Sequence, residues 1–453
     1  MKFIVVGCGK IGEAILGALA GEGHDLTVVD NRDSVINEIV NRHDVMCVNG
    51  NGVDCEVLEE AGVRSADLLI AVTGSDELNM LCCLIAKRMG ALHTIARIRN
   101  PEYNDKSLGF MREQLDLSMA INPELLTARE LYHMLKLPAA AKVETFSRRT
   151  FEMIELRLKE DSPFCGIPLW TLRERQSAKF LICVVQRGSD VFIPDGTFVL
   201  QSGDRLGLTA RPVELQKLLK SLGQSQRQAK KVMLLGGSRI AFYLSKMLLG
   251  SGSDVKVIDM DNATCRMFSE NLRGISAICG DGTHPELLLE EGLRDQDAFL
   301  ALTGMDEENI LVSCYAATQK VPRVIAKVNR DEMGALAAQV GLESIVSPKT
   351  VTVNVVLRYA RALQNSMGST KIETLYQLMD GKAEAVEFIV NEPSAVTDTP
   401  LKDLPIRKNT LIAGIVRGRT PIIPGGNDVI LPDDRVVVIS SEHRLNELTD
   451  ILK

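Results

Sequence analysis

The amino-acid sequence predicts an α/β protein with two Rossmann-like domains, each a doubly wound parallel sheet followed by a small α+β domain. Three observations support this fold class. An apolar strand at residues 3–6 runs into the glycine-rich segment GCGKIG, strands and helices alternate over residues 1–124, and the whole pattern occurs twice. Continuous Val- and Ile-rich strands separated by helices are typical of a parallel sheet covered on both faces.

The chain consists of two corresponding halves. FIVVGCGKIG at residues 3–12 recurs as VMLLGGSRIA at residues 232–241, and LLIAVTGSDELNML recurs as AFLALTGMDEENIL. The later segments FIPDGTFVLQSGDRL and IIPGGNDVILPDDRV also correspond. A repeat of this length indicates duplicated domains rather than a solenoid. We therefore expect four domains, at residues 1–124, 140–224, 230–349 and 368–453, with a polar linker at SLGQSQRQAKK between the halves.

The expected elements differ between the two kinds of domain. In the first domain, strands are predicted at residues 3–6, 26–29, 46–48, 68–72 and 94–98, and helices at stretches such as 11–20 and 79–88. The second domain has short alternating strands such as MIELRL and LICVVQR, turn signals PDG and SGD, and a final helix at residues 213–222. Helices over residues 123–134 and 350–362 have apolar faces that can pair domains.

Composition and charge exclude several classes of function. The net charge of −7 argues against a nucleic-acid binder that neutralises phosphates. The ten cysteines form no C-x-x-C motif and no zinc-like spacing, which indicates reduced thiols in the cytoplasm and no metal site. MKFIVVG is typical of a strand rather than a signal peptide. No apolar stretch reaches the roughly 18 residues that a membrane-spanning helix needs, so a membrane role is expected to act through a partner.

The strongest functional motif is G-x-G-x-x-G at Gly7, Gly9 and Gly12, between a strand and a helix. The first glycine allows a tight turn, the second lets a pyrophosphate approach the backbone, and the third lets the helix pack against the strand. The helix N-terminus attracts the anion. Asp30 ends the second strand, where a carboxylate can bond both ribose hydroxyls and favour NAD over NADP, although Arg32 follows closely.

Three further segments are expected at the same crevice, beyond the carboxyl ends of the strands. Thr73 and Gly74 follow the fourth strand and can contact ribose and phosphates. Arg97 ends the fifth strand and can reach phosphates through charge-assisted hydrogen bonds. Asn51 follows the third strand and can bond an adenine edge, although Asn-Gly is also a simple turn signal.

Three polar residues, Asp76, Glu77 and Asn79, leave two interpretations open. They can line the crevice beside Thr73 and Gly74, or they can cap the helix that follows.

The second half repeats the crevice imperfectly. Its candidate binding residues are Gly236, Gly237, Ser238, Arg239, Ile240 and Asp259. Ser238 replaces Gly9 and would crowd a pyrophosphate, and Ala241 replaces Gly12. Lys327 replaces Arg97 and loses its bidentate geometry, while Asp281 stands in place of Asn51. The second crevice is therefore expected to bind a nucleotide more weakly, to bind a different one, or to stay empty.

These motifs and their order resemble the RCK (regulator of potassium conductance) domain, over essentially all of the chain. Two such domains in one chain are similar to the peripheral regulatory subunits of Trk-type potassium-uptake systems. The resemblance implies a ring of RCK domains, a homotetramer of this chain, on the inner face of the cell membrane beneath a potassium channel or transporter. It also implies NAD(H), or ATP and ADP, as ligands. The nucleotide-contact positions of the family fall on Gly7, Cys8, Gly9, Lys10, Ile11, Asp30, Thr73, Gly74 and Arg97.

Three alternative interpretations compete with this one. A P-loop needs Ser or Thr after its lysine, whereas Ile11 follows Lys10. An NAD-dependent oxidoreductase needs a catalytic partner beside the nicotinamide. Tyr132 and Lys136 have the Y-x-x-x-K spacing, but they lie beyond the Rossmann strands, and Leu363 follows Tyr359 in the second half. A scaffold with vestigial crevices is the third alternative. Binding without catalysis is the favoured prediction.

Overall fold

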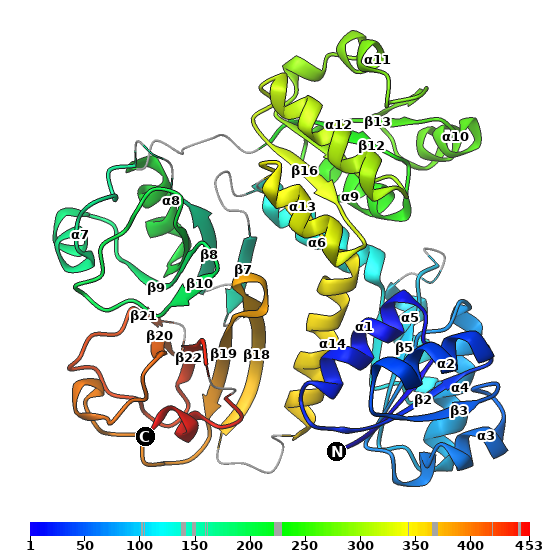
Figure 1. Cartoon of the computed structure of the whole chain (residues 1–453), viewed down its shortest axis with the longest axis horizontal. Helices are drawn as coiled ribbons and strands as arrows, with labels where there is room; N and C mark the ends of the chain where they lie inside the picture. The colour runs from blue at the N-terminus through cyan, green and yellow to red at the C-terminus, as the bar shows by residue number, and fades with distance from the viewer. Residues whose placement is uncertain are drawn as a thin grey trace. The chain divides into compact units, whose positions relative to one another are not determined.

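The chain divides into two compact units, and each unit joins corresponding domains from the two halves of the sequence. The computed structural model describes residues 1–453 except 101–102, 104, 137–141, 147–150, 159, 161, 222–228, 343, 365–369, 419 and 443–444, so most of the expected linker lies outside the described residues. Unit 1 comprises residues 1–132 and 229–357, and unit 2 comprises residues 133–228 and 358–453 (Figure 1). The order in sequence therefore differs from the grouping in space.

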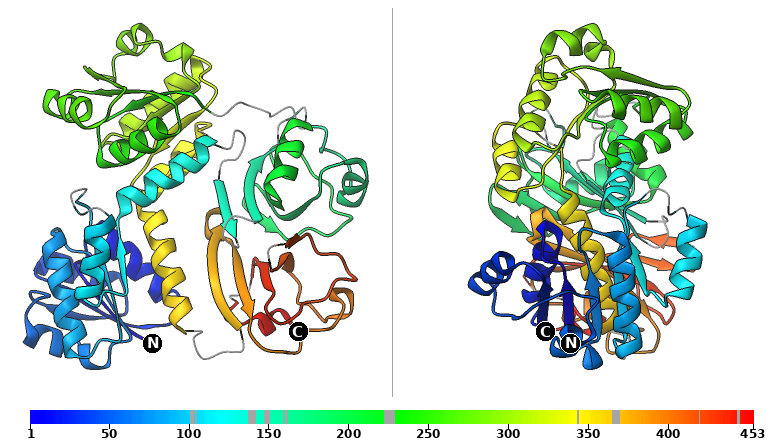
Figure 2. Two further views of the ribbon diagram at one scale, coloured as in Figure 1. Left: turned by 180° about the vertical axis from the view of Figure 1, so that it is seen from behind. Right: turned by 90° about the vertical axis from the view of Figure 1, so that its right-hand side faces the viewer.

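The first domain of unit 1 is a parallel sheet of six strands in the order β3-β2-β1-β4-β5-β6. The strands are β1 (Lys2–Val6), β2 (Asp25–Asp30), β3 (Met46–Asn49), β4 (Leu68–Ala71), β5 (His93–Arg97) and β6 (Met119–Ile121). The helices are α1 (Lys10–Ala20), α2 (Asp33–Arg42), α3 (Cys55–Glu60), α4 (Asp76–Met89), α5 (Asp105–Gln114) and α6 (Pro123–Lys136). Helices flank the sheet on both sides (Figure 2).

This sheet confirms the predicted doubly wound fold. The central strand β4 is buried along its whole length, which agrees with its unbroken apolar sequence LLIA. The order reverses between β1 and β4, and a doubly wound sheet places its ligand crevice at such a switch point. The sixth strand was not predicted, because its three residues are too short for an apolar pattern to stand out.

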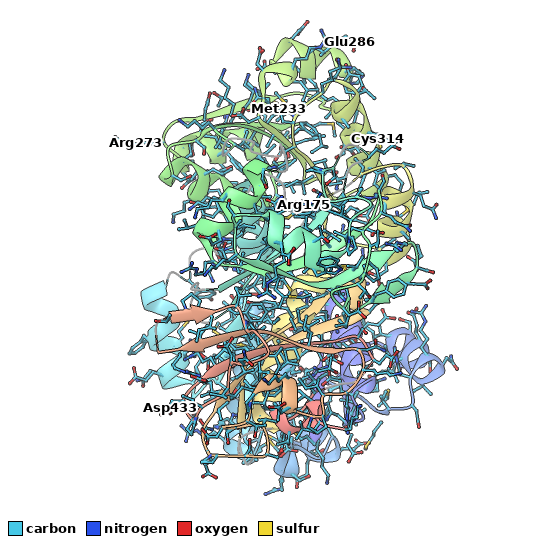
Figure 3. The ribbon with its side chains drawn as sticks, turned by 90° about the vertical axis from the view of Figure 1, so that its left-hand side faces the viewer. Arg175, Met233, Arg273, Glu286, Cys314 and Asp433 are labelled. Atoms are coloured by element: carbon cyan, nitrogen blue, oxygen red, sulfur yellow. The ribbon has the colours of Figure 1, made fainter. Side chains whose placement is uncertain are left out.

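The second domain of unit 1 repeats this sheet in the order β14-β13-β12-β15-β16-β17. Its strands are β12 (Lys231–Leu235), β13 (Asp254–Asp259), β14 (Ile275–Cys279), β15 (Ala298–Ala301), β16 (Val324–Lys327) and β17 (Ile345–Val346). Its helices are α9 (Arg239–Gly250), α10 (Asn262–Asn271), α11 (Pro285–Glu290), α12 (Asp306–Thr318), α13 (Asp331–Gln339) and α14 (Pro348–Gln364). Met233 is fully buried on β12, whereas Glu286 on α11 is exposed (Figure 3).

Unit 2 holds two small antiparallel sheets. One has the order β10-β9-β11-β8-β7, with β7 (Lys142–Phe146), β8 (Phe151–Arg157), β9 (Phe180–Arg187), β10 (Asp190–Phe192), β11 (Arg205–Ala210), α7 (Leu169–Arg175) and α8 (Pro212–Ser221). The other has the order β18-β19-β22-β20-β21, with β18 (Thr370–Leu378), β19 (Ala383–Val390), β20 (Thr410–Arg417), β21 (Thr420–Ile422) and β22 (Arg435–Ser440). The second copy ends in a 3-10 turn, Leu448–Ile451, where the first has helix α8.

The two sheets of unit 2 share one apolar cluster. Phe146, Met153 and Cys183 pack there with residues of the other sheet, including Leu378 and Ala413. Two hydrogen bonds join the sheets: the Thr209 hydroxyl donates to the Ala413 carbonyl over 3.0 Å, and the Met379 amide donates to Glu155 over 3.2 Å. No helix within the described parts of the chain is long and apolar enough to cross a membrane.

The repeated GD and DD turns hold buried ion pairs. Arg187 donates to both carboxylate oxygens of Asp204, over 2.8 and 2.7 Å, and to the Val199 carbonyl. Arg417 makes the same bonds to Asp434 and Val429 in the second copy. These acids therefore stabilise the fold, because both are almost completely buried and paired.

Replacing Arg187 by lysine is expected to lower the free energy of unfolding by about 1 kcal/mol, because lysine keeps the charge but loses the bidentate fork. Urea unfolding of the full chain measures the effect. Arg175→Lys, at an exposed position on α7 (Figure 3), is the matched control and should change nothing. Equal unfolding midpoints for the two variants would show that the fork contributes nothing.

Candidate functional site

A cavity of about 790 Å³ lies in unit 1, at the carboxyl ends of the first parallel sheet. It gathers most of the residues that the sequence predicts for the first crevice: Gly7, Gly9, Lys10, Ile11, Asp30, Asn51, Thr73, Gly74 and Arg97. Cys8 is not among the lining residues, because its side chain is buried in the core. Burial first, and the nearby Asp30 second, raise the pKa of the Cys8 thiol to about 12.

The three glycines of the loop meet three separate steric demands. Gly7 has a φ of +88°, and a Cβ there would lie 2.8 Å from the backbone of Thr73. A Cβ on Gly12 would lie 2.1 Å from the Gly7 carbonyl oxygen, so only glycine lets α1 sit this close to the loop. A Cβ on Gly9 would meet no atom of the described residues within 4 Å. The space in front of Gly9 is therefore open to a ligand.

Asp30 is fixed at the end of β2 and is only 5% exposed. Its carboxylate accepts hydrogen bonds from the Cys8 amide over 2.8 Å and from the Arg32 amide over 3.1 Å. The Arg32 guanidinium donates to both oxygens, over 2.9 and 3.0 Å. Burial alone would raise the pKa of Asp30, but the hydrogen bonds from Arg32 and Cys8 outweigh burial and lower it. Asp30 is therefore a carboxylate at neutral pH.

The loop after β4 is held by Asn79. The Asn79 side chain accepts from the Thr73 amide over 2.8 Å and from the Thr73 hydroxyl over 2.7 Å, and it donates to the Arg97 carbonyl over 2.9 Å. Asp76 accepts from the amides of Arg99 and Asn100. The helix cap is instead Ser75, whose hydroxyl accepts from the Leu78 amide.

For Asp76 and Asn79, the structure agrees with neither of the two open interpretations. Asp76 and Asn79 neither cap α4 nor line the cavity; they tie the loop to the end of β5. Asn51 lines the cavity and also accepts from the Val53 amide in a turn, so both of its interpretations stay open.

Arg97 ends β5, Arg99 follows two residues later, and both line the cavity. The Arg97 guanidinium donates to the Thr73 carbonyl, while its buried Nε has no hydrogen-bond partner among the described residues. Burial, then the charge of Arg99, lowers the pKa of Arg97. Arg99 donates to the Gly74 carbonyl and lies 3.7 Å from Asp76. The sequence prediction missed Arg99, although it stands one strand repeat beyond Arg97 in IARIR.

The structure separates the candidate residues of the second half into two groups. Gly236, Gly237 and Asp259 stay together in their own loop, where the Gly237 amide donates to Asp259 over 2.5 Å. Ser238, Arg239 and Ile240 instead line the cavity of the first half. The second crevice was expected to hold all six, and the structure adds that these three also line the first cavity. The cause is the approach of α9 to the segments after β5 and β6, where Tyr243 bonds to Arg99 and Asn122, which local sequence does not reveal.

Tyr243 of α9 joins the two Rossmann-like domains within unit 1. Its hydroxyl donates to the Arg99 carbonyl over 3.3 Å and accepts from the Asn122 side chain over 3.2 Å.

Lys327 lines the same cavity but is buried, and burial lowers its pKa. Asp281, which replaces Asn51, accepts from Thr283 and pairs with His284 at 3.2 Å.

The charge of the cavity favours an anion. The basic side chains that line it are Lys10, Arg32, Arg97, Arg99, Arg239, Lys327 and Lys349, and the acidic ones are Asp30 and Glu124. Helices α1, α6, α9 and α14 also begin at this cavity. Unpaired amides at a helix N-terminus carry partial positive charge and attract phosphate. In the described residues, no group of three or more His, Cys, Asp or Glu is placed to hold a metal ion.

Comparison with known proteins gives consistent matches over both halves. The TrkA-N domain family matches residues 3–122 and 232–348, and the TrkA-C domain family matches residues 153–223 and 385–453. The Trk system potassium uptake protein TrkA homolog of Archaeoglobus fulgidus is 33% identical over 453 residues, covering 100% of both chains. The Trk system potassium uptake protein TrkA of Vibrio alginolyticus is 29% identical, covering 97% of this chain and 95% of its own.

Solved structures share the fold. The GsuK RCK domain aligns with a TM-score of 0.63 at 18% identity, over 97% of this chain and 92% of its own. The GsuK channel bound to NAD aligns with a TM-score of 0.63 at 17% identity, over 97% of this chain and 77% of its own.

Proposed function

This chain belongs to the TrkA family of potassium-uptake proteins, with two TrkA-N and two TrkA-C domains, and from this premise we propose that it is a nucleotide-sensing regulatory subunit. In this role NAD(H), ATP or ADP occupies the cavity of the first half. The bound nucleotide then biases the state of a membrane potassium channel or transporter of the Trk type.

The observation that carries the proposal is the combination of open space at Gly9 with a buried carboxylate, Asp30, and an excess of basic side chains. The open space can hold a pyrophosphate, the Asp30 carboxylate can accept hydrogen bonds from ribose hydroxyls, and the basic side chains attract the negative charge of the phosphates. GsuK, which shares this fold, was solved both with NAD and with ADP, which supports the same ligand class here.

The physical basis of regulation is a shift of population between conformations. A nucleotide changes the state of the assembly only if it binds two states with different affinity. Because Arg239 and Lys327 of the second half line the same cavity as Gly9, a ligand there touches both Rossmann-like domains of unit 1. We propose that this arrangement couples binding to their relative position, in a homotetramer on the cytoplasmic face of the membrane.

Rubidium flux into vesicles that hold a Trk-type membrane subunit tests this function. Adding this chain should change the flux, and adding NADH, ADP or ATP should change it again. The chain with Gly9→Ala should keep the first effect and lose the second. A rubidium flux that does not change when the chain is added, or that does not change with any of the nucleotides, would contradict a nucleotide-sensing role.

Arg239 is expected to contribute to the binding of phosphate-rich ligands across the domain boundary. Arg239→Ala should weaken ATP binding by roughly threefold to tenfold. It should weaken AMP binding less, because AMP has fewer phosphates to interact with the lost charge. Calorimetry on the full chain measures both. Arg266→Ala, at an exposed position on α10, is the matched control. Equal losses for ATP and AMP would place the Arg239 charge away from the phosphate chain.

Binding is expected to proceed without turnover. This expectation is supported by the cavity, whose lining residues do not include Tyr132 and Lys136 of the Y-x-x-x-K spacing. Purified protein incubated with NADH and a panel of carbonyl acceptors should show no sustained NADH oxidation. Oxidation that Tyr132→Phe abolishes would favour the oxidoreductase alternative.

A further inference from the structure

The carboxylate of Asp30 already holds as many hydrogen bonds as it can accept. A carboxylate offers about four lone-pair positions. One oxygen accepts from the Arg32 amide and from Arg32 Nε, and the other accepts from the Cys8 amide and from Arg32 Nη2. A ribose bound through both hydroxyls needs two of these positions. It can obtain them only by displacing the side chain of Arg32, since the other two donors are backbone amides whose positions are fixed by the fold.

The second half provides an internal comparison. Asp259 occupies the position of Asp30 and accepts from the Gly237 and Asp261 amides, the counterparts of the two backbone bonds at Asp30. The position of Arg32 is taken by Asp261, which cannot donate and instead caps α10 through the Ala263 and Thr264 amides. The ends of β2 and β13 therefore share the two backbone hydrogen bonds to the carboxylate. They differ in the side chain beside it, which is positively charged in the first half and negatively charged in the second.

We propose that Arg32 is a displaceable occupant of the ribose subsite, so that an adenosine ligand binds the first crevice only by exchanging its ribose hydroxyls for the Arg32 guanidinium on Asp30. This inference rests on the proposed nucleotide-binding function. It makes Arg32 a residue that lowers affinity, in contrast to the other cations of the cavity. Its effect falls on the ribose and leaves the phosphate contacts unchanged.

Arg32 is free to leave. Its side chain is 56% exposed at the edge of the cavity, whereas that of Asp30 is 3% exposed. An exposed guanidinium regains water on release, so the exchange has a modest cost. The carboxylate stays buried and needs hydrogen-bond donors throughout, which ribose hydroxyls can supply in place of the guanidinium.

The test compares ADP with 2′,3′-dideoxy-ADP, which keeps the phosphates and adenine but lacks the ribose hydroxyls. Full chains carrying Asp259→Ala, to weaken the second crevice, are titrated by calorimetry with and without Arg32→Ala. Arg32→Ala should tighten ADP binding about fivefold and leave binding of the dideoxy nucleotide unchanged. Arg32→Gln should behave in the same way, which guards against a local loss of packing.

Arg64→Ala is the matched control, because Arg64 forms a similar exposed fork on Glu59 away from the cavity. ADP binding that is unchanged or weakened by both Arg32 substitutions would overturn the inference, as would an equal gain for the two nucleotides. Failure of the unmodified parent chain, titrated alongside, to bind any adenine nucleotide would overturn the proposed function, and the inference with it. The two failures are thus distinguished by the behaviour of that parent chain.

Discussion

Gly9→Ala is expected to reduce nucleotide binding in the first crevice by roughly 10–100-fold, because overfilling a packed site costs about 1–3 kcal/mol. The added methyl group would occupy the open space that faces the cavity. The backbone itself accepts a side chain here, since Gly9 has φ −74° and ψ −170° and its counterpart Ser238 has φ −68° and ψ 167°. The loss should therefore be one of binding and not of folding.

Two glycines of the chain serve as controls for this substitution. Gly334→Ala on α13 also adds a methyl group into open space, but outside the cavity, and it should leave binding unchanged. Gly12→Ala should instead lower the melting temperature, because its Cβ would meet the Gly7 carbonyl oxygen. Calorimetric titration and thermal unfolding of the three variants separate the two roles. Full nucleotide affinity in a folded Gly9→Ala protein would show that the pyrophosphate does not bind at this loop.

Asp30→Ala is expected to weaken nucleotide binding by roughly 10–100-fold, because hydrogen bonds to a charged group contribute about 1.5–3 kcal/mol. The substitution removes the acceptor of both ribose hydroxyls, but it also releases Arg32, which offsets part of the loss. A nucleotide that lacks the ribose hydroxyls should be affected much less.

The counterpart substitution, Asp259→Ala, is the matched control for Asp30→Ala, because the two carboxylates have the same backbone partners in different halves. It should leave the first crevice intact. Nucleotide binding that is retained in Asp30→Ala and lost in Asp259→Ala would show that the principal site lies in the second half.

The sequence predicted what depends on local chemistry. The family membership and the doubly wound fold are confirmed. Glycine positions are informative because Gly7 needs a positive φ and Gly12 a close approach, which other residues cannot provide. Asp30 was recognisable because it ends an apolar strand, where parallel sheets place their ligand-binding edge. That these residues hold a nucleotide remains a prediction.

The rest depends on packing that no local pattern encodes. The first turn of α9 reaches the cavity of the first half only because the two Rossmann-like domains share one unit. The roles of Asp76 and Asn79 arise from hydrogen bonds to residues at the end of β5 and just after it, more than fifteen residues away along the chain. The cysteines show the same limit, because Cys82 and Cys83 are buried whereas Cys55 and Cys279 are exposed. Spacing alone cannot distinguish these cases.

The most direct test of the central claim is calorimetric titration of the full chain with NAD, NADH, ADP and ATP, repeated on Gly9→Ala. The account predicts that at least one of these nucleotides binds the unmodified chain and that the Gly9→Ala protein, although folded, binds it at least tenfold more weakly. Absence of binding by all four, or equal affinity in the two proteins, would contradict it.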